Sequence, residues 1–124
     1  MKRVLFVDDS PTVVEAAYDE LEDKGYVVDV AYNGKKAIKL LEECEEELPH
    51  LIVMDIEMPK LKGDEAVIRI KENPAWKHIP VIALTARKQD VIGEALDLFE
   101  DYLIKPFGFD SLLETVEKLI GPPD

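Results

Sequence analysis

The chain has 124 residues, enough for one domain with a core of its own. Its 27 acidic residues outnumber its 15 basic ones, and the net charge of -12 argues against direct binding of nucleic acid, whose phosphates would be repelled. A single cysteine, Cys44, excludes an internal disulfide. With no signal peptide and no apolar stretch of about 20 residues, we expect a cytoplasmic protein that does not enter a membrane.

Short apolar runs and amphipathic segments alternate along the chain. Ser10 and Pro11 are a favoured N-cap and a favoured first helical residue, and Gly25 suits the end of that helix. Asn33 and Gly34 predict a turn before the next helix. The expected strands are 3–7, 27–31, 51–54, 81–84 and about 101–104. The expected helices are about 11–24, 35–47, 64–72, 88–98 and 109–120.

This alternation predicts an α/β fold with a doubly wound parallel sheet of (βα)5 type, because parallel strands need crossover connections. A dinucleotide-binding sheet would have a glycine-rich turn after its first strand. Here that turn holds Asp8 and Asp9, whose charges would repel a pyrophosphate. We therefore predict the flavodoxin-like strand order 2-1-3-4-5. No linker, repeat or low-complexity segment divides the chain, so residues 1–124 are expected to form one domain.

Chemically active side chains stand where four of the predicted strands end: Asp8, Asp9, Asp55, Thr85 and Lys105. Ligand sites of open parallel sheets lie beyond the carboxyl ends of the strands, so these side chains are expected to converge. Each residue taken singly has an ordinary explanation, such as a helix cap or a solvated loop. The set taken together favours a binding site.

Three converging carboxylates need a cation. Two carboxylates about 4 Å apart repel each other by roughly 4 kcal/mol at an effective dielectric constant near 20. The predicted strand ends offer oxygen ligands and neither histidine nor cysteine, which favours Mg²⁺ over zinc. The ammonium group of Lys105 and the hydroxyl group of Thr85 would complete a cradle for a phosphoryl group.

On these residues the sequence resembles the receiver domain of two-component response regulators, in the stand-alone form typified by chemotaxis regulators. The resemblance covers essentially the whole chain. Four ordered motifs carry it: Val7-Asp8-Asp9-Ser10, Met54-Asp55-Ile56-Glu57-Met58-Pro59 with Gly63, Leu84-Thr85-Ala86, and Asp101-Tyr102-Leu103-Ile104-Lys105-Pro106-Phe107.

The resemblance implies a phosphoprotein that takes part in phosphorelay signal transduction. Asp55 would accept a phosphoryl group from a histidine kinase. Asp9, Asp55 and the backbone carbonyl of Glu57 would bind Mg²⁺ directly, and Asp8 would act through water. Thr85 and Lys105 would contact the phosphoryl oxygens, and the Lys105-Pro106 peptide bond would be cis.

The resemblance also implies a switch made of Thr85, which moves inward on phosphorylation, and Tyr102 on the fifth strand. A separate hypothesis concerns Glu57 and Arg87, which flank the cluster in sequence and would pair across its mouth to shield the aspartyl phosphate from water. The chain departs from the family at Leu98-Phe99, where a Gly-Ala pair is common. This departure puts the fourth helix, the output surface and any dimer mode in doubt.

Two other classes of function are compatible with parts of this pattern. One is a small Mg²⁺-dependent phosphohydrolase with an aspartyl nucleophile, although Asp8 and Asp9 are adjacent where such enzymes have an Asp-x-Asp motif. The other is a degenerate receiver that only binds partners. The complete set of acidic, hydroxyl and lysine site residues argues against this second class. We expect no catalysis beyond autodephosphorylation. We expect the signal to pass through contacts with an unknown protein target. The oligomeric state would be a monomer or a phosphorylation-dependent dimer. The kinase-docking face of the family is resembled by Val13, Ala16, Ala17 and Pro106.

Overall fold

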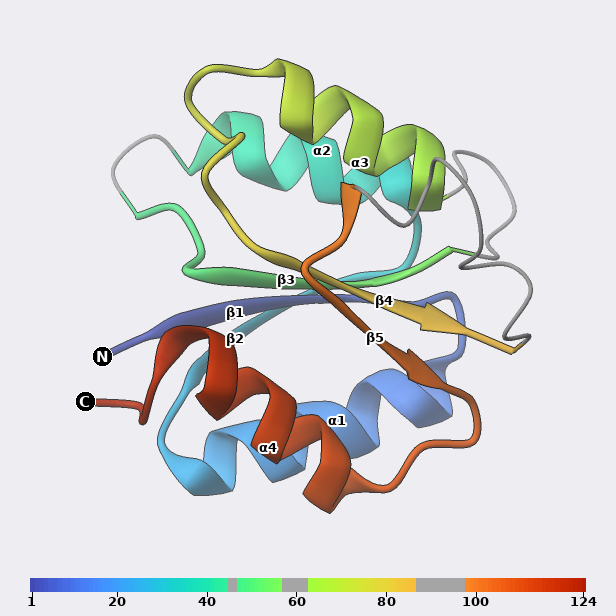
Figure 1. Cartoon of the computed structure of the whole chain (residues 1–124), viewed down its shortest axis with the longest axis vertical. Helices are drawn as coiled ribbons and strands as arrows, with labels where there is room; N and C mark the ends of the chain where they lie inside the picture. The colour runs from blue at the N-terminus through green and yellow to red at the C-terminus, as the bar shows by residue number, and fades with distance from the viewer. Residues whose placement is uncertain (45–46, 57–62, 87–97) are drawn as a thin grey trace.

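The computed structural model describes residues 1–44, 47–56, 63–86 and 98–124, and Figure 1 shows a single parallel sheet with helices on both faces. The order of the strands is β2-β1-β3-β4-β5, and every neighbouring pair is parallel. The predicted flavodoxin-like order is therefore confirmed. The strands are β1 (Arg3–Val7), β2 (Val27–Ala31), β3 (Leu51–Asp55), β4 (Val81–Thr85) and β5 (Asp101–Ile104).

The helices lie in two layers (Figure 1). Within the described residues they are α1 (Pro11–Lys24), α2 (Gly34–Glu43), α3 (Gly63–Glu72) and α4 (Phe109–Ile120). One core, built around Phe6 and Val53, packs under α1 and α4, and the other, built around Leu5 and Met54, packs under α2 and α3. Since successive strand residues point to opposite faces, the apolar runs of β1, β3 and β4 fill both cores.

Helix ends follow the local sequence. Ser10 caps α1 by accepting a hydrogen bond from the Val13 N–H, and Gly25 ends the helix in the left-handed region at φ 108°. Asn33 caps α2 by accepting from the Lys36 N–H, so the predicted turn at Asn33-Gly34 is a helix start. Asparagine serves both purposes because its short side chain bonds the nearby backbone.

The second helix is shorter than predicted. It ends at Glu43, and Cys44 leaves helical geometry with ψ 54°, whereas the sequence pattern suggested a helix as far as Glu47. The apolar stripe stops at Leu41, and the acidic residues after it are unfavourable at a helix C-terminus. The helix predicted over 88–98 falls outside the described residues apart from its last position.

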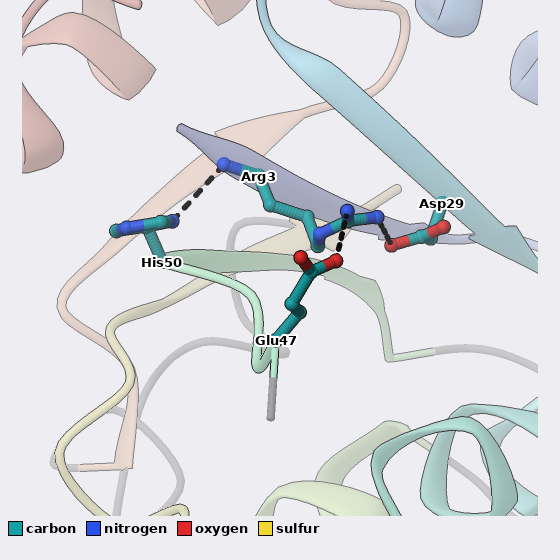
Figure 2. A network of polar contacts seen from close by, with 4 residues as sticks. All are labelled: Arg3, Asp29, Glu47 and His50. Atoms are coloured by element: carbon teal, nitrogen blue, oxygen red, sulfur yellow. Dashed lines mark hydrogen bonds and ion pairs between the residues drawn. The ribbon is translucent and has the colours of Figure 1, made fainter. Parts of the chain in front are cut away.

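Glu47 instead belongs to a polar network at the amino ends of the strands (Figure 2). The guanidinium group of Arg3 lies 2.9 Å from carboxylate oxygens of both Asp29 and Glu47. The backbone N–H of Arg3 donates to Nδ1 of His50 at 3.0 Å. The network ties β1 to β2 and to the segment that leads into β3, at the edge of the sheet opposite the strand ends that carry the acids.

A second polar contact fixes the start of β4. The Val81 N–H donates to Oε2 of Glu100 at 2.5 Å, and the Glu100 N–H donates to the Val81 carbonyl oxygen at 2.9 Å. The other carboxylate oxygen of Glu100 accepts from Nζ of Lys71 at 2.8 Å, and the same ammonium group donates to the Ile79 carbonyl oxygen at 3.0 Å. Next to Glu100, Phe99 is buried in the core beneath α2 and α3.

Both ends of the chain are held at the amino edge of the sheet. The Lys2 N–H donates to the Pro123 carbonyl oxygen at 2.9 Å, and the hydroxyl group of Tyr26 donates to the Gly121 carbonyl oxygen at 2.9 Å. Figure 1 shows the two termini close together at the side where β1 begins. Among the helices in the described ranges, none has both the length and the hydropathy needed to cross a membrane.

Candidate functional site

Three aspartates gather at the carboxyl edge of the sheet. Asp8 and Asp9 follow β1, and Asp55 is the last residue of the neighbouring strand β3. One carboxylate oxygen from each residue lies within 4.8 Å of the other two. Asp8 and Asp55 are buried, whereas Asp9 is exposed. The three acids thus converge as their positions at strand ends predict.

The turn between β1 and α1 orients Asp8. Its Oδ1 accepts a hydrogen bond from the Ser10 N–H at 2.9 Å, which is the usual bond of an aspartate at a turn. Its backbone N–H donates to the Ala31 carbonyl oxygen at 3.2 Å, so the pairing with β2 continues one residue beyond the strand. The turn therefore uses Oδ1 and leaves Oδ2 facing the cluster.

Lys105 crosses the end of the sheet to reach this cluster. It follows β5, and its backbone N–H donates to the Thr85 carbonyl oxygen at 2.7 Å. Its Nζ lies 2.7 Å from Oδ2 of Asp8 and 3.1 Å from Oδ2 of Asp55. Within the described part of the chain, Oδ2 of Asp8 receives no hydrogen bond of good angle, so the ion pair is its main interaction.

These contacts set the protonation of Lys105. Burial by itself lowers the pKa of the ammonium group. The close ion pair with Asp8, followed by the charge and hydrogen bond of Asp55, more than offsets the effect of burial, so the pKa of Lys105 lies above its usual value. Lys105 is therefore a fixed positive charge at neutral pH, placed between two buried carboxylates.

Thr85 and Tyr102 occupy different surroundings. Thr85 ends β4 and is fully buried, in register with Ile104 of β5. Tyr102, on β5, is 36% exposed, so its side chain is accessible at the surface. The Lys105-Pro106 peptide bond is cis, as the family resemblance implied.

Two predicted site residues, Glu57 and Arg87, lie outside the described residues. The contact between Lys105 and Asp8 was missed by the sequence reasoning, which assigned Lys105 to phosphoryl oxygens alone. The strand order contained the signal. β1 and β3 are adjacent, so a lysine long enough to reach the end of β3 over β4 also approaches the end of β1.

The cluster fits a hard divalent cation. Its donors are carboxylate oxygens, which Mg²⁺ and Ca²⁺ prefer, and one ligand atom from each of Asp8, Asp9 and Asp55 is already within reach of a common point. Oδ2 of Asp8 is buried, and no described residue donates a well-angled hydrogen bond to its lone pairs. A bound cation would satisfy these lone pairs and reduce the repulsion among the three acids.

An apolar cavity of about 470 Å³ adjoins the cluster between α1 and the segment after β5. Lys105 forms part of its wall and so connects the cavity to the acids. Phe107 and Phe109 meet edge to face, with ring centroids 5.9 Å apart. The residues that line the cavity are Thr12, Val13, Ala16, Lys105, Pro106, Phe107 and Phe109.

Comparisons with known proteins agree with this geometry. Residues 4–117 match the response regulator receiver domain family. An uncharacterized 14.6 kDa protein of Leptolyngbya boryana is 41% identical, covering 98% of this chain and 93% of that protein. Protein PilH of Pseudomonas aeruginosa is 34% identical, covering 98% of this chain and 99% of that protein.

A solved structure has the same fold with a ligand bound. The response regulator TrrA of Thermotoga maritima, in complex with Mg²⁺–BeF, superimposes with a TM-score of 0.85 at 36% identity, covering 96% of this chain and 99% of that chain. Receiver domains bind Mg²⁺ at a cluster of aspartates and receive phosphoryl groups from sensor histidine kinases. They act as signalling switches and are not conventional enzymes. The family match and the acidic cluster together show that this chain belongs to the response regulator receiver domains, which are phosphorylation-dependent signalling switches.

Proposed function

We propose that Asp55 is the residue that accepts the phosphoryl group. The observation that carries this assignment is its environment: a carboxylate that is 2% exposed at the end of a central strand, with Nζ of Lys105 at 3.1 Å and two further aspartates within reach. An aspartate carboxylate is an established covalent acceptor in phosphoryl transfer. Asp8 has its Oδ1 committed to the Ser10 N–H, and Asp9 is exposed, so Asp55 is the best-placed acceptor.

The proposed step is a simple exchange of one bond for another. A carboxylate oxygen of Asp55 attacks the phosphorus of a phosphohistidine, and an O–P bond forms as the P–N bond breaks. The electron pair of the broken bond stays on the imidazole nitrogen. Such a transfer requires positioning and neutralisation of charge more than covalent help from the protein. Lys105 supplies a positive charge at the acceptor oxygen, and Thr85 is proposed to contact a phosphoryl oxygen.

Asp8, Asp9 and Asp55 are proposed to hold Mg²⁺. The backbone carbonyl of Glu57, outside the described residues, is proposed as a further ligand, and Asp8 would act through water. When bound, the metal would neutralise charge on the phosphoryl oxygens. The carboxylates would hold it, and Lys105 supplies a separate positive charge next to Asp8 and Asp55.

The signal is proposed to leave the site through Thr85 and Tyr102. Phosphorylation adds about 1.5 to 2 negative charges to Asp55, and such a change needs an element with two arrangements to report it. Thr85 lies on β4 and Tyr102 on the adjacent β5. An inward shift of the Thr85 hydroxyl group toward the phosphate would open space for the exposed Tyr102 ring.

The cavity beside Pro106 is proposed as the docking face for the histidine kinase. It is apolar, it lies next to Lys105, and Val13 and Ala16 of α1 line it. A kinase seated there would present its phosphohistidine at the edge where Asp55 lies. Ala17, which was expected on this face, is fully buried on the core-facing side of α1, and Thr12 and Phe107 line the cavity with Val13 and Ala16.

Glu57 and Arg87 are proposed to control how long the phosphoryl group persists. Shielding by such a pair would slow attack by water on the aspartyl phosphate, which is the autodephosphorylation expected of this domain. Rates of dephosphorylation of Glu57→Ala and Arg87→Ala, measured after removal of the phosphodonor, test the idea. Faster loss in both variants supports it, and unchanged rates in both contradict it.

The acceptor is tested by incubation of the full chain with acetyl phosphate and Mg²⁺, followed by intact-mass measurement. We expect the wild-type chain and Asp110→Asn to gain one phosphoryl group, and Asp55→Asn to gain none. Asp110 is a matched control because it is an exposed aspartate in the first turn of α4. Equal labelling of Asp55→Asn would show that another residue is the acceptor. Steady turnover of p-nitrophenyl phosphate would favour the alternative, a phosphohydrolase.

We further propose that residues 1–124 act as one receiver domain in the cytoplasm, signalling through an unidentified protein target and not through nucleic acid. The relatives of similar length support a stand-alone regulator. The net charge of -12 supports the exclusion of nucleic acid. Sedimentation of the chain with and without acetyl phosphate distinguishes a monomer from a phosphorylation-dependent dimer.

A further inference from the structure

A second cavity lies on a different part of the surface, between α1 and the edge strand β2. It has a volume of about 270 Å³, below the roughly 300 to 1,000 Å³ that small-molecule sites occupy, so it suits one or two side chains of a peptide. We call it the tyrosine groove. The described residues that line it are Val14, Glu15, Tyr18, Asp19, Val30 and Tyr32.

Two aromatic rings are exposed in this groove. Tyr18 of α1 and Tyr32, directly after β2, are each 38% exposed, whereas Val14, which also lines the groove, is buried. Most of the other aromatic side chains of the described residues, such as Phe6 and Tyr26, are buried or partly buried. Two tyrosines from different elements at one cavity offer flat faces for a side chain that stacks on aromatic rings.

Carboxylates on α1 complete the groove. Glu15 and Asp19 line it, and neither takes part in an ion pair between described residues. The neighbouring carboxylate of Glu22, together with partial burial and the charges of Asp19 and Asp29, raises the pKa of Tyr18. The field around the ring is therefore negative. Of these acids, Asp29 is already paired with Arg3, as Figure 2 shows.

We propose that the tyrosine groove is a docking site for an arginine-bearing segment of a partner protein. A guanidinium group is planar, stacks on tyrosine faces and binds carboxylates through two parallel hydrogen bonds. Tyr18 and Tyr32 supply the faces, and Glu15 and Asp19 supply the carboxylates. Lysine would satisfy the charge but would stack less well, so the groove selects arginine.

The position of the groove separates it from phosphoryl transfer. Glu15 and Tyr18 lie on a different side of α1 from Thr12, Val13 and Ala16, which face the cavity beside Pro106. One helix would therefore present a kinase-facing side and an arginine-binding side at the same time. The two sites can be tested independently, because acetyl phosphate labels the acceptor without any protein partner.

The test is an NMR titration of the isotope-labelled full chain with the blocked peptide acetyl-Gly-Arg-Gly-Arg-Gly-amide and with its lysine counterpart. We expect shifts concentrated at Tyr18, Tyr32 and their neighbours, and an arginine peptide that binds about threefold tighter than the lysine peptide. Shifts spread evenly over the acidic surface, or equal affinity for both peptides, would overturn the proposal.

Two matched double variants distinguish binding at the groove from attraction to the net negative charge of the protein. Glu15→Gln/Asp19→Asn is expected to weaken arginine-peptide binding about threefold to tenfold, which lies within the range expected for the loss of two exposed ion pairs. Glu114→Gln/Glu117→Gln removes the same charge from α4 and is expected to weaken binding less than about twofold. Equal weakening by both would show attraction to net charge alone and overturn the proposal. Tyr18→Leu/Tyr32→Leu should abolish the preference for arginine, and unimpaired labelling of each variant by acetyl phosphate verifies its fold.

Discussion

The ammonium group of Lys105 lies 2.7 Å from Oδ2 of Asp8, closer than the 3.1 Å that separates it from Oδ2 of Asp55. Asp8 belongs to the end of β1 and Lys105 to the segment after β5, so the contact passes over the ends of β3 and β4. Asp8 is fully buried, and a buried carboxylate needs a compensating charge. Lys105 provides this charge within the protein itself.

We therefore expect Lys105→Met to destabilise the metal-free protein. Removing one partner of a buried ion pair leaves the other charge uncompensated, and because Lys105 is partly exposed we expect a loss of about 1 to 3 kcal/mol. Urea unfolding at neutral pH measures it. Lys105→Arg keeps the charge and should lose less. A Lys105→Met chain as stable as the wild type would contradict the assigned role of this ion pair.

Mg²⁺ should stabilise the folded chain through the same acids. A ligand that binds only the folded state at 100 times its dissociation constant adds about 2.7 kcal/mol to the free energy of unfolding. Asp9→Asn should remove most of this increment while leaving metal-free stability unchanged or slightly raised, because Asp9 is exposed and adds to the repulsion. Urea unfolding with and without MgCl₂ checks this, with Glu42→Gln on the exposed surface of α2 as a control that should keep the full increment.

Glu100 should contribute to stability through its bond to the backbone of Val81. Glu100→Ala leaves the N–H of a buried strand residue without its acceptor, which costs about 1 to 3 kcal/mol. Glu100→Gln retains a carbonyl acceptor and should lose less. A double-mutant cycle with Lys71→Met should give a coupling of only about 0.2 to 1 kcal/mol, since the Lys71–Glu100 pair is partly exposed. A coupling as large as the whole effect of Glu100→Ala would argue against the backbone bond as the main contribution.

Stability should decline at alkaline pH partly because of Tyr26. Burial, and secondly the charge of Glu117, raise the pKa of its hydroxyl group. The folded state thus holds this proton more tightly than the unfolded chain. The contribution is complete below the ordinary pKa of about 10 and is lost as pH rises through the raised folded-state pKa.

Tyr26→Phe isolates this contribution. It removes the hydrogen bond to the Gly121 carbonyl oxygen and should cost about 0.5 to 1.5 kcal/mol near pH 8. Because the wild type loses its advantage as the hydroxyl group ionises, the two unfolding free energies should converge as the pH rises from about 10 to about 12. Urea titrations across that range check it, and a constant difference would show that Tyr26 does not titrate with folding.

The fold was predictable because each level of the sequence indicated the same structure. β1, β3 and β4 are continuous apolar runs, as central parallel strands require, and Ser10, Pro11 and Gly25 mark the ends of α1. The convergence of Asp8, Asp9 and Asp55 followed from strand order alone, since neighbouring parallel strands end at one edge.

Contacts between side chains distant in sequence were not predictable in the same way. Glu47 reads as a helical residue, yet it pairs with Arg3, because the apolar stripe of α2 ends earlier and a cation lies nearby. The sequence pattern assigns Glu100 no role, and its bond to Val81 depends on the register of β4 against β5. Local propensity carries no information about such partners.

The attachment of residues 121–124 beside β1 has a practical consequence. The Lys2–Pro123 and Tyr26–Gly121 hydrogen bonds hold both termini at the edge where the strands start, away from the three aspartates. A tag, fluorophore or fused module joined to either terminus would emerge on that remote side. Such labels would leave phosphoryl donors an open approach to Asp55, so immobilised or tethered forms of the protein can be assayed without shielding their chemistry.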